Sequence, residues 1–128
     1  MESDERNRFD AMLEDVLSSL PDEYRALLEE APLVVEDHPS EELIEQLGID
    51  PEEVLCGLHS GLSLAERSVE QSGDLPSVMH LFREDIVDHA GGWEDPGAVL
   101  REIRITLLHE MGHHFGLEEE DLRRLGYE

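Results

Sequence analysis

The sequence predicts an α+β fold. Apolar residues recur at helical spacing near both ends of the chain, over residues 3–30 and 95–125. Between them stand short apolar runs that are too brief for helices and favour strands, at 33–37, 56–66 and 77–83. Helices, then strands, then helices is an order typical of α+β proteins. At 128 residues, one domain spanning 1–128 is expected.

The first part of the chain predicts three helices and one strand. Over residues 3–20 one buried helix face is formed by Phe9, Met12, Leu13, Val16, Leu17 and Leu20. Pro21 ends that helix and begins a short second one, with acidic residues in its first turn. The β-branched run LVVED at 33–37 lies between prolines and favours a strand. A third helix is expected from the N-cap Ser40 to Gly48.

The central part predicts the remaining strands. The glycine-punctuated segment 56–66 is interpreted as a strand with a turn at Ser60-Gly61. The run SVMHLFR at 77–83 alternates, and because both of its sides are largely apolar it is expected to be covered. A helical turn or two follows, over 83–92.

The longest helix begins at Asp95-Pro96 and ends at Gly116. Its apolar stripe consists of Val99, Ile103, Leu107 and Met111, flanked by Leu100, Leu108 and Phe115. The run EEEDLRRL at 118–125 predicts a short final helix, closed by Gly126.

Composition narrows the class of partner. The net charge is −24 and all nine basic residues are arginine, so we expect no nucleic-acid partner, because phosphate binding needs clustered cations. The one cysteine, Cys56, permits no intramolecular disulfide, and its apolar neighbours favour a packing role. No targeting segment and no run of membrane-spanning length is visible, so the expected protein has no membrane partner and is cytoplasmic.

The run HEMGHHFG at 109–116 carries the chemistry. His109 and His113 are four residues apart in the predicted helix, so their imidazoles project from one face and can hold one metal ion. Neutral imidazole is a preferred Zn²⁺ ligand. Glu110 follows the first histidine and is placed to act as a general base for zinc-bound water. His109-Glu110-Met111-Gly112-His113 is thus the HExxH signature of zinc hydrolases.

A purely structural interpretation without metal stands beside this one. Histidines are favoured at a helix C-terminus and acids at the start of the next helix. On that interpretation His109, His113 and His114 serve the helix end, and 118–121 is a solvated first turn.

The segment VLREIRITLLHEMGHHFGLEEEDLRRLGY resembles the terminal part of the bacterial zincin-like metallopeptidase family. SSLPDEYRALLE, VVED, GLHSGLSLAER and LPSVMHLFRE resemble the same family in the same order. The resemblance implies a minimal zincin-like domain, a small mixed sheet packed on an active-site helix and flanking helices. It also implies zinc-dependent hydrolysis of peptide bonds, with a peptide or unfolded protein as substrate. A non-catalytic zinc-binding or interaction protein of the same fold is the alternative.

The third metal ligand is expected just after the second histidine. In the related HExxHxxGxxH pattern the third histidine falls where this chain has Glu119, and a carboxylate is an acceptable zinc ligand. Glu119 is therefore the expected ligand, with Glu118, Glu120 and Asp121 as alternatives.

Supporting roles are assigned to a few further residues. Glu102 and Thr106 share the His109 face and are candidates for orienting it, with a solvated or satisfied side chain as the alternative. His114 or Tyr127 is a candidate donor to the oxyanion. Residues 77–83 are the candidate strand to which an extended substrate would add. The other histidines are expected to be structural, namely His38, His59, His80 and His89.

Overall fold

A computed structural model describes residues 1–30, 32–48, 50, 55–60 and 78–124. Its elements are, in chain order, α1 (Ser3–Ser19), α2 (Asp22–Leu27), β1 (Leu33–Glu36), α3 (Glu41–Leu47), β2 (Gly57–Ser60), β3 (Val78–Phe82), α4 (Arg83–His89), α5 (Pro96–Phe115) and α6 (Glu119–Arg124). This is the predicted α+β class, and none of the described helices is long and apolar enough to cross a membrane.

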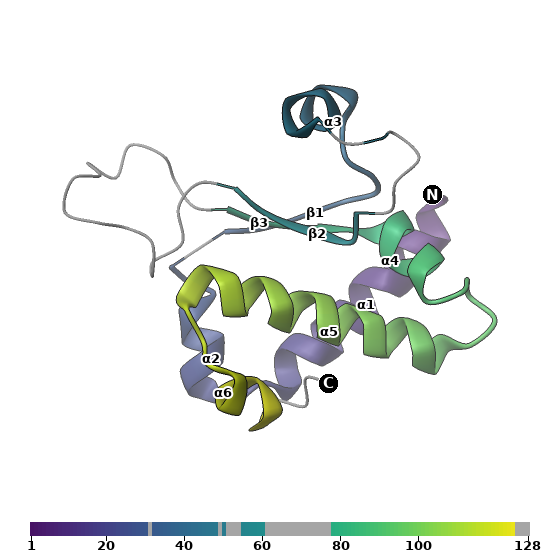
Figure 1. The fold of residues 1–128 in the computed structure, drawn as a ribbon. Helices are drawn as coiled ribbons and strands as arrows, with labels where there is room; N and C mark the ends of the chain where they lie inside the picture. The colour runs from purple at the N-terminus through teal and green to yellow at the C-terminus, as the bar shows by residue number, and fades with distance from the viewer. Residues whose placement is uncertain (31, 49, 51–54, 61–77, 125–128) are drawn as a thin grey trace.

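The three described strands form one mixed sheet in the order β1-β3-β2 (Figure 1). β1 runs parallel to β3, with Leu33 opposite Met79, and β2 runs antiparallel to it, with Leu58 opposite His80. β3 is therefore the central strand, hydrogen-bonded on both sides. Its Met79 and Leu81 are fully buried.

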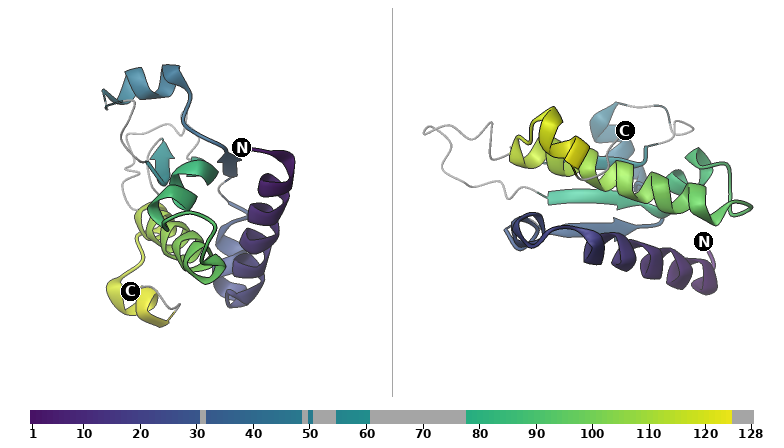
Figure 2. Two further views of the ribbon diagram at one scale, coloured as in Figure 1. Left: turned by 90° about the vertical axis from the view of Figure 1, so that its right-hand side faces the viewer. Right: turned by 90° about the horizontal axis from the view of Figure 1, so that it is seen from below.

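The helices divide unequally between the two faces of the sheet. α1 and α5 lie together beneath one face, and α3 lies on the opposite side, as Figures 1 and 2 show. The core fills the space between α1, α5, α4 and the sheet, and includes Phe9, Leu13, Val16, Met79, Leu81, Ile86, Val99, Ile103, Leu107, Leu108 and Met111. α5 is thus packed against β2, β3, α1 and α4, and these contacts fix its position in the fold.

The observed bounds of α5 agree with those predicted from its capping residues and its apolar stripe. Asp95 caps the helix by accepting hydrogen bonds from the backbone N–H groups of Gly97 and Ala98. All four residues of the predicted apolar stripe are fully buried. Gly116 ends the helix with φ +67°, a left-handed conformation that glycine adopts without strain.

An ion-pair network joins α1 to the end of the sheet. Asp37, which follows β1, accepts hydrogen bonds from Arg6 of α1 and from Arg83, the first residue of α4. Arg83 also donates to Asp10 of α1. The two arginines lower the pKa of Asp37, chiefly through the hydrogen bond from Arg6.

The strand predictions hold with shifted limits. Within the segment 56–66 the strand is Gly57–Ser60. The predicted turn at Ser60-Gly61 and the predicted helix end at Gly126 involve residues outside the described part of the chain. The segment 77–83 gives the strand Val78–Phe82, because Arg83 already begins α4. The expectation that both sides of this strand are covered is met in part: Met79 and Leu81 are buried, whereas Val78 and His80 are half-buried.

Candidate metal and catalytic site

The side chains of His109 and His113 converge. Their Nε2 atoms lie 3.1 Å apart, and the rings meet edge to face with centroids 4.6 Å apart. Two imidazole nitrogens bound to one tetrahedral Zn²⁺ at 2.0–2.1 Å stand about 3.3 Å apart. The spacing of the two nitrogens therefore fits a shared zinc ion.

Partial desolvation of the exposed His109 favours the protonation state that a metal ligand needs. The pKa of His109 is lowered, first by desolvation and second by the neighbouring His113. A lowered pKa keeps the imidazole neutral near pH 7, and only the neutral ring offers a lone pair to a metal.

Glu110 lies on the sheet side of α5. Its residue is 7% exposed, and burial raises the pKa of its carboxyl group. Among the described residues its carboxylate makes no hydrogen bond or ion pair, and the nearby His113 offsets part of the rise in its pKa. A carboxylate with a raised pKa and no hydrogen bond to hold its charge is suited to take up and release a proton.

Two cavities meet at His109. One, of about 460 Å³, lies between β2 and α5 and is lined by Cys56, Gly57, His89, Glu102, Ile105, Thr106, His109 and Glu110. We call it the β2–α5 cavity. The other, of about 310 Å³, opens toward α6 and is lined by His109, Gly112, His113, Leu117 and Leu122. His109 thus faces one space suited to substrate and another through which a further ligand can approach.

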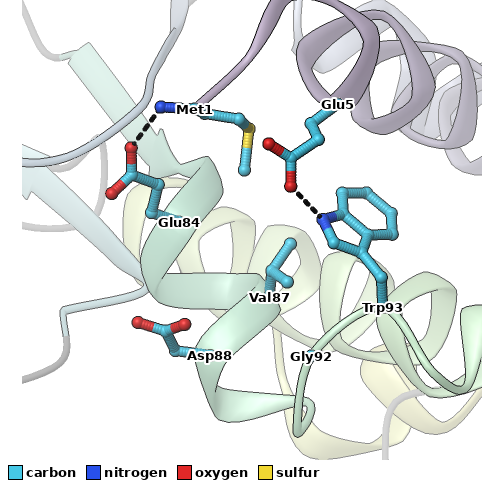
Figure 3. A pocket seen from close by; sticks show the side chains of 7 residues that line it. All are labelled: Met1, Glu5, Glu84, Val87, Asp88, Gly92 and Trp93. Atoms are coloured by element: carbon cyan, nitrogen blue, oxygen red, sulfur yellow. Dashed lines mark hydrogen bonds and ion pairs between the residues drawn. The ribbon is translucent and has the colours of Figure 1, made fainter.

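Another cavity, of about 370 Å³, lies between the start of α1 and α4 and is lined by Met1, Glu5, Glu84, Val87, Asp88, Gly92 and Trp93. Figure 3 shows the Met1 amino group on Glu84 and the Trp93 indole on Glu5. None of the residues predicted to carry chemistry lines this cavity, so it is not the candidate active site.

Local turn geometry brings α6 back beside the two histidines. After Gly116, the N–H of Leu117 donates to the carbonyl of Gly112 at 3.1 Å, closing a Schellman-type turn. The side chain of Leu122 in α6 packs beside Gly112: a Cβ on this glycine would lie 3.5 Å from Cδ1 of Leu122. Gly112 stands between His109 and His113 in sequence, so α6 packs directly against the segment that carries the two candidate metal ligands.

The contacts of Asp121 bear on which acidic residue could serve as a third metal ligand. Asp121 accepts hydrogen bonds from the N–H of Glu118, from Arg124 and from the hydroxyl of Tyr24, and these contacts lower its pKa. Asp121 is thus committed to joining α6 to α2. Among the described residues no group of three His, Cys, Asp or Glu side chains is arranged to hold a metal. The side chain of Glu119 lies outside the described part of the chain.

Three of the four histidines expected to be structural have partners in the described chain: His38 and His80, and His89, which pairs with Glu102. His38 Nδ1 lies 2.7 Å from the buried carboxylate of Asp85. His80 Nδ1 is 3.8 Å from Glu36, and its ring stacks on Phe82. The side chain of His59 lies outside the described residues.

The predicted oxyanion donors receive no support from the structure. His114 is 1% exposed and packs edge to face on Phe115, so it lines neither cavity at His109. Tyr127 lies outside the described residues.

The predicted roles of Glu102 and Thr106 also change. The Oε2 atom of Glu102 lies 2.9 Å from Nδ1 of His89, and within the described chain Glu102 makes no other side-chain hydrogen bond. Glu102 therefore orients His89 and not His109. Thr106 is 7% exposed and packs against Gly57. Both residues nevertheless line the β2–α5 cavity together with His109.

The prediction that an extended substrate adds to the strand in residues 77–83 is wrong. β3 carries a hydrogen-bonded neighbour on each side, so its backbone has no edge to offer to an added strand. Among the described strands, the edge strand beside α5 is β2. Sequence alternation reports which faces of a strand are covered but not which strands are its neighbours, and this is why the prediction failed.

Gly57 is a site residue that the sequence interpretation missed. A Cβ at this position would lie 2.9 Å from Cγ2 of Thr106 and 3.1 Å from both Cγ and Oε2 of Glu110. The absence of a side chain lets β2 approach α5 directly over the predicted base. A glycine within a strand pattern is the available signal, because it often marks a close approach of backbone.

Cys56 behaves as a packing residue, as predicted. Its thiol is 3.6 Å from the carbonyl oxygen of Asp85, and desolvation, followed by the charges of Glu102, Asp85 and Asp88, raises its pKa to about 11. At neutral pH the thiol is therefore protonated and a poor nucleophile.

A helix carrying an HExxH sequence with convergent histidines, packed on a small mixed sheet, defines a zincin-like domain. The sequence matches the family described as Zincin-like metallopeptidase over residues 28–127, most of the chain. The chain belongs to this family. No curated protein matches the sequence.

Proposed function

We propose that this protein is a zinc-dependent peptidase, with His109 and His113 as metal ligands and Glu110 as general base. The observation that carries the proposal is the 3.1 Å separation of the two Nε2 atoms, next to a buried carboxylate that has no partner in the described chain and lines a cavity. Membership of the zincin-like family supports the same reaction class.

Glu119 is the third ligand in this proposal. It begins α6, three residues before Leu122, and residues three apart share a helix face. Leu122 packs on Gly112, between the two histidines in sequence. Asp121 is the weaker candidate, because its two oxygens already accept hydrogen bonds from Glu118, Arg124 and Tyr24.

Each group has a defined part in the chemistry. Zn²⁺ held by this set supplies Lewis-acid polarisation of the peptide carbonyl and makes water easier to deprotonate. Glu110 takes the proton from the attacking water and passes it to the amine that leaves. Its burial favours proton return, since desolvation disfavours the charged carboxylate.

The substrate in this proposal is a peptide or an unfolded protein. An extended chain would add to β2, the edge strand of the described sheet next to α5, and not to β3. Such a peptide would pass along the β2–α5 cavity, where Gly57 leaves room for Glu110. The cytoplasmic location stays a prediction from the sequence.

Metal content and cleavage test the proposal together. Protein purified without added metal is analysed for zinc beside His113→Ala, and both are incubated with a peptide pool read by mass spectrometry. We expect about one zinc per chain and discrete cleavage products, both lost in the variant. Zinc-free wild-type protein that binds none on addition would overturn the metal site. A zinc-loaded protein that cleaves nothing in a diverse pool would leave the non-catalytic alternative.

A further inference from the structure

We infer that the β2–α5 cavity is a subsite for a cationic side chain, arginine or lysine, of the substrate, and that Glu102 recognises it. This inference rests on the proposed hydrolysis at His109 and Glu110, and it names the substrate class of that site.

The cavity extends from the reacting groups to Glu102. His109, Thr106 and Glu102 line it from one face of α5, and His89 closes the far end from the last residue of α4. Seven residues separate Glu102 from His109, which is about 10 Å along a helix at 1.5 Å per residue. A peptide held at His109 would need a long side chain to reach that distance, as arginine and lysine have.

Carboxylates dominate the charge of the cavity. Within the described part of the chain its lining residues include the carboxylates of Glu102 and Glu110, the imidazoles of His89 and His109, and no arginine. Asp85 and Asp88 add to the negative potential: the pKa of Cys56 in the cavity wall is raised first by desolvation and then by the charges of Glu102, Asp85 and Asp88. The net charge of −24 extends the same preference over long range. A cation entering this space is therefore attracted and an anion is repelled.

Glu102 keeps hydrogen-bonding capacity toward the cavity. Its Oε2 is 2.9 Å from Nδ1 of His89, while within the described residues its Oε1 accepts no hydrogen bond. A carboxylate has lone pairs on both oxygens, so His89 can orient Glu102 and still leave an acceptor for a guanidinium or ammonium group.

A second feature marks the cavity as a ligand site. Glu110 is 93% buried and lines the cavity, yet within the described chain it has no hydrogen-bond or ion-pair partner. The carboxylate oxygens of Glu110 are not sealed from solvent, so a ligand that enters the cavity can reach them. Glu102 and Glu110 thus line one space that a ligand can enter.

Binding of a neutral isostere tests the charge directly. The full-length protein, labelled with ¹⁵N, is titrated with N-acetyl-arginine amide and with N-acetyl-citrulline amide, which has the same shape but no charge. We expect saturable shifts of the Gly57 and Thr106 amide signals, with arginine binding about tenfold tighter than citrulline at low salt. In the Glu102→Gln variant, arginine and citrulline should bind with about equal affinity.

A matched charge change elsewhere serves as the control. Glu45→Gln removes one carboxylate from the exposed surface of α3, across the sheet from α5, and should keep the arginine preference (Figure 1). Equal shifts with citrulline, a preference that survives Glu102→Gln, or the same loss in Glu45→Gln would each overturn the subsite. Circular dichroism verifies that each variant is folded.

The two proposals can fail separately, because binding is measured without cleavage. If arginine binds through Glu102 but no peptide is cut, the cavity binds cations, whereas the peptidase proposal and the substrate role of the cavity both fall. If zinc-dependent cleavage occurs with equal kcat/KM for arginine and citrulline substrates, the peptidase stands and the subsite falls.

Discussion

Gly57 lies so close to Glu110 that a Cβ at position 57 would stand 3.1 Å from the Oε2 atom of the carboxylate. The same Cβ would be 2.9 Å from Cγ2 of Thr106, closer than carbon atoms pack. The first residue of β2 therefore sets how near the sheet edge comes to the proposed base.

Gly57→Ala should displace Glu110 or Thr106 and disturb the site. We expect a loss of unfolding free energy of about 1–3 kcal/mol, typical of an added methyl group in a packed region, together with a fall in kcat/KM at unchanged zinc content. Thr106→Ser removes the Cγ2 atom that collides, so the double variant should regain part of both losses. A double variant no better than Gly57→Ala would contradict this contact, and Thr106→Ser alone is the control.

Glu110→Gln separates catalysis from metal binding. The amide keeps the size of the side chain but cannot take up the proton, so kcat should fall about 10²- to 10⁴-fold. Zinc content, measured by elemental analysis, should stay near that of the wild type, because Glu110 is not among the proposed ligands. Unchanged cleavage in this variant would remove Glu110 from the mechanism and favour a non-catalytic zinc protein.

Glu119→Gln and Asp121→Asn discriminate between two candidate ligands. Loss of a direct ligand should weaken zinc affinity by more than about 100-fold, which is about 2.7 kcal/mol. Asp121→Asn should leave the affinity within about threefold and instead loosen α6, since Asp121 joins Tyr24, Arg124 and the N–H of Glu118. Competition with a chromophoric chelator measures both. The reverse pattern would make Asp121 the ligand.

Asp37 should make the stability of the fold depend on acid. Its pKa is lowered in the folded state, mainly by Arg6, so the ion pairs stabilise the protein above the unfolded-state pKa, and this stabilisation is lost as pH falls through the folded-state pKa. Asp37→Asn should cost about 1–2 kcal/mol at pH 7, and the difference from wild type should shrink in strong acid. Urea unfolding at several pH values measures this.

The exposed pair of Asp22 and Arg25 is the control for Asp37. Its charged atoms are 3.7 Å apart at the surface of α2, so Asp22→Asn should change the unfolding free energy by less than about 0.5 kcal/mol. Equal effects of the two substitutions would mean that the network around Asp37 adds nothing beyond surface charge.

Cys56 should react slowly with iodoacetamide. With a pKa of about 11, only about one thiol in a thousand is ionised at pH 8, and the thiolate is the reactive form. Alkylation of the folded protein should be about 100-fold slower than in 8 M urea and should accelerate as pH rises. Equally fast alkylation in both states would contradict the burial of this thiol beside three carboxylates.

Sequence patterns located the helices well, because their signals are local. The stripe from Val99 to Met111 shows which side of α5 is buried, and Asp95 and Gly116 show where it begins and ends. The strands were less determined. The alternation in 77–83 shows a strand, but the pairing of β3 with both β1 and β2 depends on residues far away in sequence.

The sequence alone determined the α+β class, the limits of α5 and the pairing of His109 with His113, since residues four apart in a helix must share a face. Tertiary structure alone decided that β2 is the strand next to Glu110, that Gly57 makes room for it, that Asp121 is occupied by Tyr24, and that Glu102 and His109 line one cavity. Helical neighbours follow from a fixed repeat along the chain, whereas contacts between distant segments follow from how the whole core packs.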